Sequence, residues 1–131
     1  MNRGAKIFAV LTILLAAVFA SGAPAAAETG LHCNQNVCFD VHGKKLNVSG
    51  VDGYYSNKNY SIHCGFMILF VNGKQSYQSN ELCTVPYGWG PKPMHVNINR
   101  NFANGTQICA EIRGTQGHKN LNGHPCITVH S

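Results

Sequence analysis

Several segments of this chain alternate apolar and polar residues with a period of two, which is the pattern of a half-buried β-strand. In the stretch VCFDVH, Val37, Phe39 and Val41 fall on one face, while Asp40 and His42 fall on the other. A turn over residues 43–45 and a short strand over residues 46–49 follow. No stretch after the first 27 residues has a helical apolar stripe, so the alternation predicts a fold built from strands.

Two Asn-Gly pairs predict tight turns, because both residues tolerate the positive φ angles of a two-residue hairpin. Asn72-Gly73 separates a long strand, residues 60–71, from a return strand, residues 74–82, and this places residue 81 opposite Cys64. Asn104-Gly105 is expected to join strands 94–99 and 108–113 into a second hairpin, and a last strand covers residues 126–130. The pattern predicts an all-β fold of about 7–8 strands, either an antiparallel β-sandwich or a small barrel.

The first 27 residues have the composition of a secretory signal peptide. Arg3 and Lys6 precede an uncharged apolar run over residues 7–20, and Ala25-Ala26-Ala27 supplies the small residues of a cleavage site. The run is shorter than the roughly 20 residues that span a bilayer, which favours a cleaved signal over a membrane anchor. We therefore expect a signal peptide of bacterial type at residues 1–27 and a single secreted β domain at residues 28–131, with no membrane span after cleavage.

Six cysteines follow the expected cleavage site: Cys33, Cys38, Cys64, Cys83, Cys109 and Cys126. An even number of cysteines in a short exported chain is typical of a disulfide framework. We prefer pairing between neighbours, 33–38, 64–83 and 109–126. The first predicted hairpin brings residue 64 close to residue 83, and one loop joins the strands that carry the last two cysteines.

The charge distribution argues against a nucleic-acid partner. The formal net charge is +5, and removal of Arg3 and Lys6 with the signal lowers it to +3. The remaining basic residues are scattered, and only Lys44 and Lys45 are adjacent. Nucleic-acid binding usually depends on a denser basic stripe.

The loop between the last two cysteines contains His118 and His124, which suggests a metal site with Cys109 and Cys126. A structural zinc site usually contains two closely spaced cysteines, and that pair is missing here. Cysteines that are oxidised after export are also not thiolate ligands. We expect instead a disulfide-closed loop that displays the two histidines, with no metal and no cofactor.

Few acidic residues are available for catalysis. Glu111 and Arg113 share one face of a predicted strand, and with His95 or His63 they would provide the base, the phosphate ligand and the acid of a small secreted ribonuclease. An ordinary exposed ion pair is the simpler interpretation of the two strand residues. We therefore expect a protein that is not an enzyme.

Two aromatic segments are candidates for partner binding. The stretch TVPYGWGPKP holds Tyr87 and Trp89 between prolines, which stiffen the segment and reduce the entropy lost on binding. Trp and Tyr are common at interfaces, although a Trp89 that covers one end of the core is an equally good interpretation. A second expected loop, GVDGYYSNKNY over residues 50–60, is rich in tyrosine and small polar residues. The candidate binding residues are Tyr54, Tyr55, Tyr87, Trp89, His118 and His124.

The segments NGTQICAEIRG and GHPCITVH resemble the last hairpin of immunoglobulin-like sandwiches. Small exported sandwich proteins of similar size and cysteine content occur as inhibitors of secreted hydrolases, as antimicrobial proteins, and as adaptor subunits of the large secreted toxin particles called umbrella toxins. The lack of a convergent acid/base set, the three disulfides and the aromatic segments favour a secreted protein-binding module. The resemblance to these small exported proteins implies that it is an adaptor or subunit of an extracellular complex. Its partner would be another secreted or cell-surface protein. The alternatives are a hydrolase inhibitor, a carbohydrate- or cell-wall-binding domain with a glycan ligand, and the ribonuclease.

Overall fold

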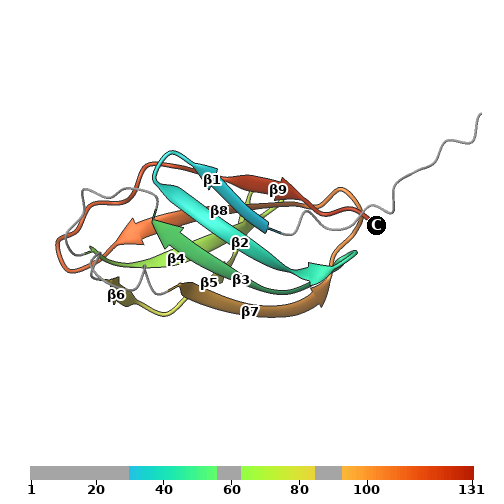
Figure 1. Ribbon diagram of the computed structural model, residues 1–131, viewed down its shortest axis with the longest axis horizontal. Helices are drawn as coiled ribbons and strands as arrows, with labels where there is room; N and C mark the ends of the chain where they lie inside the picture. The colour runs from blue at the N-terminus through green and yellow to red at the C-terminus, as the bar shows by residue number, and fades with distance from the viewer. Residues whose placement is uncertain (1–29, 56–62, 85–92) are drawn as a thin grey trace, which may run out of the picture.

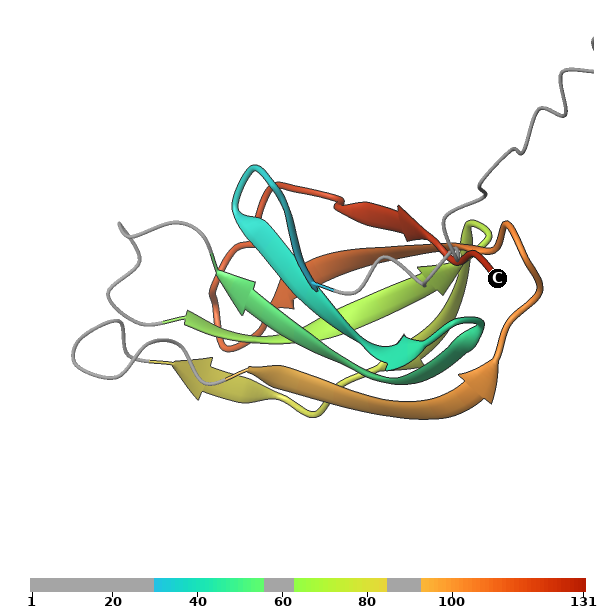
Figure 2. The same cartoon turned by 45° about the vertical axis from the view of Figure 1, so that its right-hand side comes forward.

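The computed structural model describes residues 30–55, 63–84 and 93–131, and within them two antiparallel sheets face each other across one core (Figures 1 and 2). Sheet A has the strand order β1-β2-β3-β7, with β1 (Gly30–Asn34), β2 (Val37–Lys44), β3 (Asn47–Tyr55) and β7 (Met94–Asn101). Sheet B has the order β5-β4-β8-β9, with β4 (His63–Val71), β5 (Lys74–Gln78), β8 (Gln107–Gly114) and β9 (Cys126–Thr128), and β6 (Leu82–Thr84) also pairs with β4. The prediction of an all-β antiparallel sandwich is confirmed, with nine strands in the described residues.

The core lies between the inner faces of the two sheets. Val37, Phe39 and Val41 of β2 are at most 1% exposed, and the predicted inner residues of β8, at positions 108, 110 and 112, are equally buried. Both face assignments are therefore confirmed, because alternate residues of a strand point to opposite sides of its sheet.

All three disulfides join residues that lie directly opposite each other on neighbouring strands. Their positions are Cys33–Cys38 between β1 and β2, Cys64–Cys83 between β4 and β6, and Cys109–Cys126 between β8 and β9. The predicted pairing is confirmed. Since disulfides persist in oxidising compartments, these bridges fit an extracellular protein.

The hairpin at Asn72-Gly73 forms as predicted, but its return strand is divided into β5 and β6. The hydroxyl of Ser79 accepts the Met67 N–H at 2.8 Å, and the Ser79 N–H donates to the Met67 carbonyl at 2.9 Å. This buried serine lies between β5 and β6 in the chain, and its two bonds continue the hydrogen bonding to β4 across the break. A register shift in the β4–β5 pairing and the break before β6 place Cys83, rather than residue 81, opposite Cys64.

The second predicted hairpin is wrong, because its two strands belong to different sheets. Strand β7 pairs with β3, whereas β8 pairs with β4 and β9. Asn104-Gly105 does form a turn, and its Gly105 N–H donates to the Val129 carbonyl at 2.7 Å. Phe102 is 7% exposed and enters the core where the chain passes from one sheet to the other. The turn signal was therefore correct, but it carries no information about which sheet receives the next strand.

The region around Tyr54 and Tyr55 was also predicted incorrectly. Strand β3 continues to Tyr55, so the two tyrosines end a strand and do not lie in a loop. Gly50 and Gly53 both lie within this strand and are buried. A Cβ atom on Gly53 would lie 2.6 Å from the Met67 sulfur, so glycine here permits the close approach of the two sheets.

The predicted signal peptide lies outside the described residues, as do the segments at 56–62 and 85–92. Across the part of the chain that is described, there is no helix of the length and apolar character needed to cross a membrane.

Candidate functional site

The outer face of sheet A carries a row of side chains at directly paired positions of its four strands. The row runs from Leu31 on β1 through Asp40 and Asp52 to His95 on β7. Leu31 is 60% exposed, and within the described ranges it is the one large hydrophobic side chain that is exposed. The row is therefore apolar at the β1 edge of the sheet and polar toward β7.

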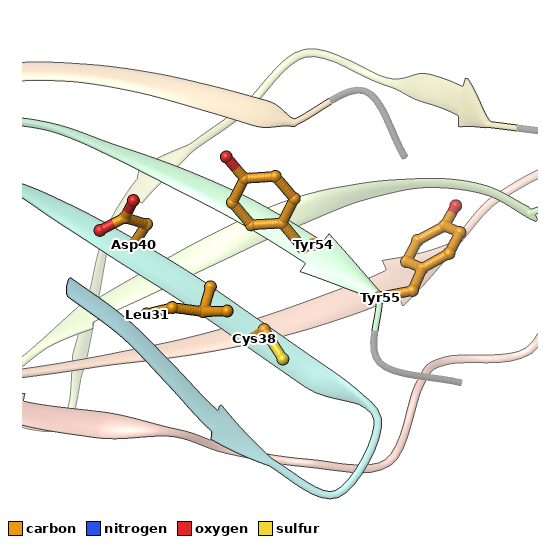
Figure 3. Close-up of a pocket in the computed structure, with 5 residues that line it drawn as sticks. All are labelled: Leu31, Cys38, Asp40, Tyr54 and Tyr55. Carbon is orange, nitrogen blue, oxygen red and sulfur yellow. The ribbon is translucent and has the colours of Figure 1, made fainter. Parts of the chain in front are cut away.

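A groove of about 320 Å³ opens on this face next to Leu31, and we call it the Leu31 groove. Its other lining residues are Cys38, Asp40, Tyr54 and Tyr55. Figure 3 shows Leu31 and Cys38 opposite the Tyr54 ring, with the Asp40 carboxylate and the Tyr55 ring toward opposite ends. Three strands thus contribute an apolar surface and one carboxylate to a single open site.

Beside the groove, Asp52 binds two histidines through its two oxygens. Its Oδ2 lies 2.8 Å from His42 Nε2, and its Oδ1 lies 2.5 Å from His95 Nδ1. Partial burial alone would raise the pKa of Asp52, but the hydrogen bonds and charges of His95 and His42 lower it below its usual value. The same hydrogen bond raises the pKa of His95, whose Nε2 also donates to the Asn97 Oδ1 at 2.9 Å.

Asp40 differs from Asp52, because within the described residues its carboxylate accepts no hydrogen bond. Its nearest charged group is the His42 ring, with Nε2 at 3.9 Å, and its side chain is 29% exposed. Burial, together with the negative charges of Asp52 and Asp40, raises the pKa of Tyr54. The groove therefore has a negative end, where the Asp40 carboxylate can accept a hydrogen bond from another molecule.

A second polar cluster lies on the outer face of sheet B, next to a cavity of about 280 Å³. Glu111 Oε2 lies 3.4 Å from Arg113 Nη2, and Glu111 Oε1 lies 3.2 Å from His124 Nδ1. The His124 ring also packs on Phe70, with ring centroids 5.5 Å apart. The strand pair suggested by the sequence is thus present, and His124 is the histidine that joins it.

Neither histidine considered for the ribonuclease reaches Glu111. His95 is on sheet A, and His63 is fully buried at the start of β4. The His63 ring contacts Tyr55, with centroids 5.0 Å apart, and His118, with centroids 5.1 Å apart. Burial, reinforced by the charge of His118, lowers the pKa of His63. His118 therefore packs against a buried ring and is not displayed alongside His124.

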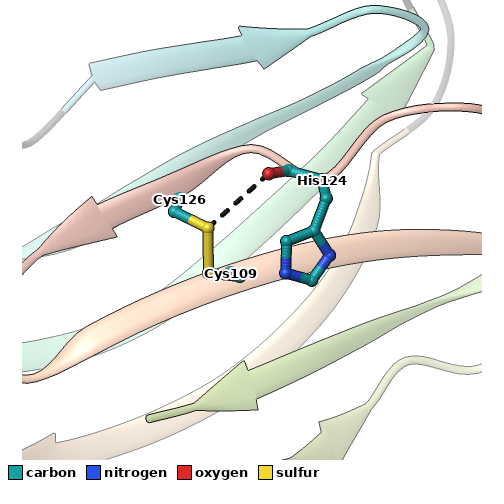
Figure 4. Close-up of side chains that lie close together, drawn as sticks. All are labelled: Cys109, His124 and Cys126. Carbon is teal, nitrogen blue, oxygen red and sulfur yellow. Dashed lines mark hydrogen bonds between the residues drawn. A yellow bond between two sulfur atoms is a disulfide. The ribbon is translucent and has the colours of Figure 1, made fainter. Parts of the chain in front are cut away.

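The suggested metal ligands are only partly brought together. Cys109, Cys126 and His124 lie within 4.8 Å of one another, whereas His118 belongs to the His63 cluster. Figure 4 shows that the two sulfur atoms are bonded to each other, with the His124 carbonyl oxygen 3.5 Å from the Cys126 sulfur. Sulfur atoms in a disulfide cannot serve as thiolate ligands.

The six predicted binding residues do not form one surface. Tyr54 and Tyr55 line the Leu31 groove, while His124 lies on the other sheet. Tyr87 and Trp89 fall outside the described residues, so their role stays a prediction.

Leu31 and Asp52 are the important site residues that sequence reasoning missed. Strand β1 was not predicted, so Leu31 had no assigned neighbours, and the second strand was expected to end before Asp52. The signal in the sequence was the two-residue spacing of Asp52 and Tyr54, which places both side chains on one face if the strand continues through them.

The geometry describes a small disulfide-linked β-sandwich with an apolar, partly acidic groove on one outer face. Comparison with models of protein families, with curated proteins and with solved structures found no match to this chain.

Proposed function

We propose that this protein is a secreted, non-catalytic module that binds another secreted or cell-surface protein through the Leu31 groove. The observation that supports this most directly is the exposed Leu31 side chain beside a groove with two tyrosines. Covering an exposed leucine with a partner makes the free energy of binding more favourable, and tyrosine supplies apolar area together with a polar group.

The groove residues lie on hydrogen-bonded strands, and the Cys33–Cys38 disulfide adjoins them. A preorganised surface loses less conformational entropy on binding than a flexible loop. An adaptor or subunit of a bacterial extracellular complex, such as a toxin or antimicrobial complex, is the form of this proposal that the sequence favours. Inhibition of a secreted hydrolase would use the stretch around Trp89.

The test is affinity capture from extracellular fluid of the producing organism, followed by calorimetric titration of the recovered protein. Leu31→Asp and Tyr54→Ala should each weaken binding at least about tenfold, equivalent to roughly 1.4 kcal/mol. Gln75→Asp, an exposed change on β5 of sheet B, is the matched control and should bind like the wild type. Equal affinity of all three variants would show that binding does not use the groove.

A glycan ligand remains the closest variant of this proposal, because aromatic rings such as Tyr54 also stack on sugar rings. Sedimentation with chitin, cellulose and purified cell wall separates the two. Retention of the wild type but not of Tyr54→Ala on one polysaccharide would favour a carbohydrate-binding domain.

A second candidate function, cleavage of RNA, is supported by the meeting of Glu111, Arg113 and His124 beside a cavity. We place it second because Glu111 already contacts both Arg113 and His124, and a substrate phosphate would have to separate them from Glu111. A base and an acid that act on one phosphodiester need the substrate between them. An RNA cleavage assay decides: activity that is lost in Glu111→Gln and His124→Gln would establish the enzyme.

A further inference from the structure

We propose that the Leu31 groove receives a basic side chain, lysine or arginine, of the partner protein, with the Asp40 carboxylate as its counter-charge. This inference rests on the function proposed above, and it specifies the chemistry of the partner residue that enters the groove.

The acidic residues differ in how many contacts they already make. In the described residues, Asp52 is held by two histidines, Glu111 contacts Arg113 and His124, and Glu81 accepts the Gln116 amide at 2.6 Å. Asp40 is the acid in this part of the chain that has no hydrogen bond. A carboxylate beside an apolar groove is therefore available to a donor from another molecule.

The groove matches the shape of a basic side chain. Lysine and arginine have a long aliphatic stem and a charged tip, and they pack the stem on apolar surface while the tip reaches a polar partner. Here the stem would lie along Leu31, the Cys38 disulfide and the face of Tyr54, and the tip would reach Asp40 at the end of the groove (Figure 3). A cation over a tyrosine ring gains further stabilisation.

Apolar and acidic side chains fit the groove less well than a basic one. A purely apolar side chain would cover Asp40 without replacing the water that solvates its charge, and this costs free energy. An acidic side chain would be repelled by Asp40 and by the neighbouring Asp52. The described groove lining contains no basic residue that would compete with the partner for Asp40.

The experiment is an NMR titration of the isotope-labelled protein with two short peptides. One peptide carries a single arginine between leucines, and the other has citrulline, a neutral isostere, in place of arginine. The expected result is shift changes confined to residues 31–33, 38–40 and 52–55, with the arginine peptide binding about fivefold or more tightly than the citrulline peptide.

Two variants assign the difference to one carboxylate. Asp40→Asn should reduce the affinity for the arginine peptide to that for the citrulline peptide. Glu81→Gln, a matched change at an exposed acid outside the groove, should leave the ratio unchanged.

Equal affinities for the two peptides, or no effect of Asp40→Asn, would overturn the inference, as would the absence of binding by either peptide at millimolar concentration. The function proposed above is judged separately by the Leu31→Asp variant and the intact partner. If that variant loses partner binding while the peptides bind equally, the groove is the binding site but its ligand is not a basic side chain.

Discussion

The three disulfides allow a direct test of how cross-links stabilise this sandwich, because they differ in loop length but not in burial pattern. Each joins a cysteine that is at most 4% exposed to a cysteine that is exposed. The cysteines are 5 residues apart in Cys33–Cys38 and 17 apart in Cys109–Cys126. Restricting the unfolded chain contributes about 2 kcal/mol for the shorter loop and about 3 kcal/mol for the longer one.

The perturbation replaces both cysteines of one bridge by alanine, and stability is measured by urea unfolding. The loss of one buried and one exposed sulfur is common to both variants, so it largely cancels when they are compared. With a slope of about 1.5 kcal/mol per M urea, the midpoint should fall by about 2 M without Cys109–Cys126 and by about 1.3 M without Cys33–Cys38. A variant lacking Cys33–Cys38 that is as unstable as the other, or less stable, would refute the reasoning from loop length.

Three further predictions concern the packing and the titrating groups. Gly65→Ala should lower the free energy of unfolding by about 2 kcal/mol, measured by urea unfolding, because the new Cβ would lie 2.3 Å from the Arg113 carbonyl oxygen; a loss below about 0.5 kcal/mol would contradict this packing. The lowered pKa of buried His63 means that acidification below its usual value of 6.5 protonates the unfolded chain first, so stability should fall there. This fall should be smaller in His63→Phe, as calorimetry at a series of pH values would show, and an unchanged pH profile would count against the assignment. Asp52→Asn should lower the pKa of His95 in an NMR pH titration, since the hydrogen bond to Asp52 is what raises it. In the wild type, the contribution of the Asp52–His95 pair to the free energy of unfolding is lost as pH falls through the lowered pKa of Asp52 and as pH rises through the raised pKa of His95. A His95 pKa that is unchanged in Asp52→Asn would exclude the coupling.

The strand content was predictable because alternation and burial are both local properties of a half-buried strand. The faces of β2 and β8 and the three disulfides followed from this periodicity and from cysteine spacing. The sheet to which β7 belongs could not be predicted in this way, because an Asn-Gly turn reverses the chain equally well within one sheet or between two. The length of β3 was missed because Gly50 and Gly53 are loop formers in general. Here Gly53 permits the close approach of Met67 from the other sheet, and a Cβ on Gly50 would crowd the neighbouring strand β7 at His95 and Val96.

The candidate site was less predictable than the fold, since it depends on which strands are neighbours. The sequence placed Asp40 and His42 on one face, but it could not place Asp52 between His42 and His95 without the pairing of β3 to both β2 and β7. The tyrosines at the end of β3 were identified by composition alone, and their role in a groove depends on Leu31, which comes from the unpredicted β1.

The two outer faces of the sandwich treat their carboxylates differently, and this difference favours sheet A as the binding surface. On sheet B, Glu111 already contacts a guanidinium and an imidazole, so a partner cation would have to replace existing contacts. On sheet A, His42 and His95 occupy Asp52 and leave Asp40 next to an exposed leucine. A partner cation would therefore add an interaction at Asp40 without breaking a hydrogen bond, while its aliphatic part covers apolar surface that is otherwise in water. For a protein whose formal net charge is positive, such a local negative site would also oppose the general repulsion between the domain and a basic partner.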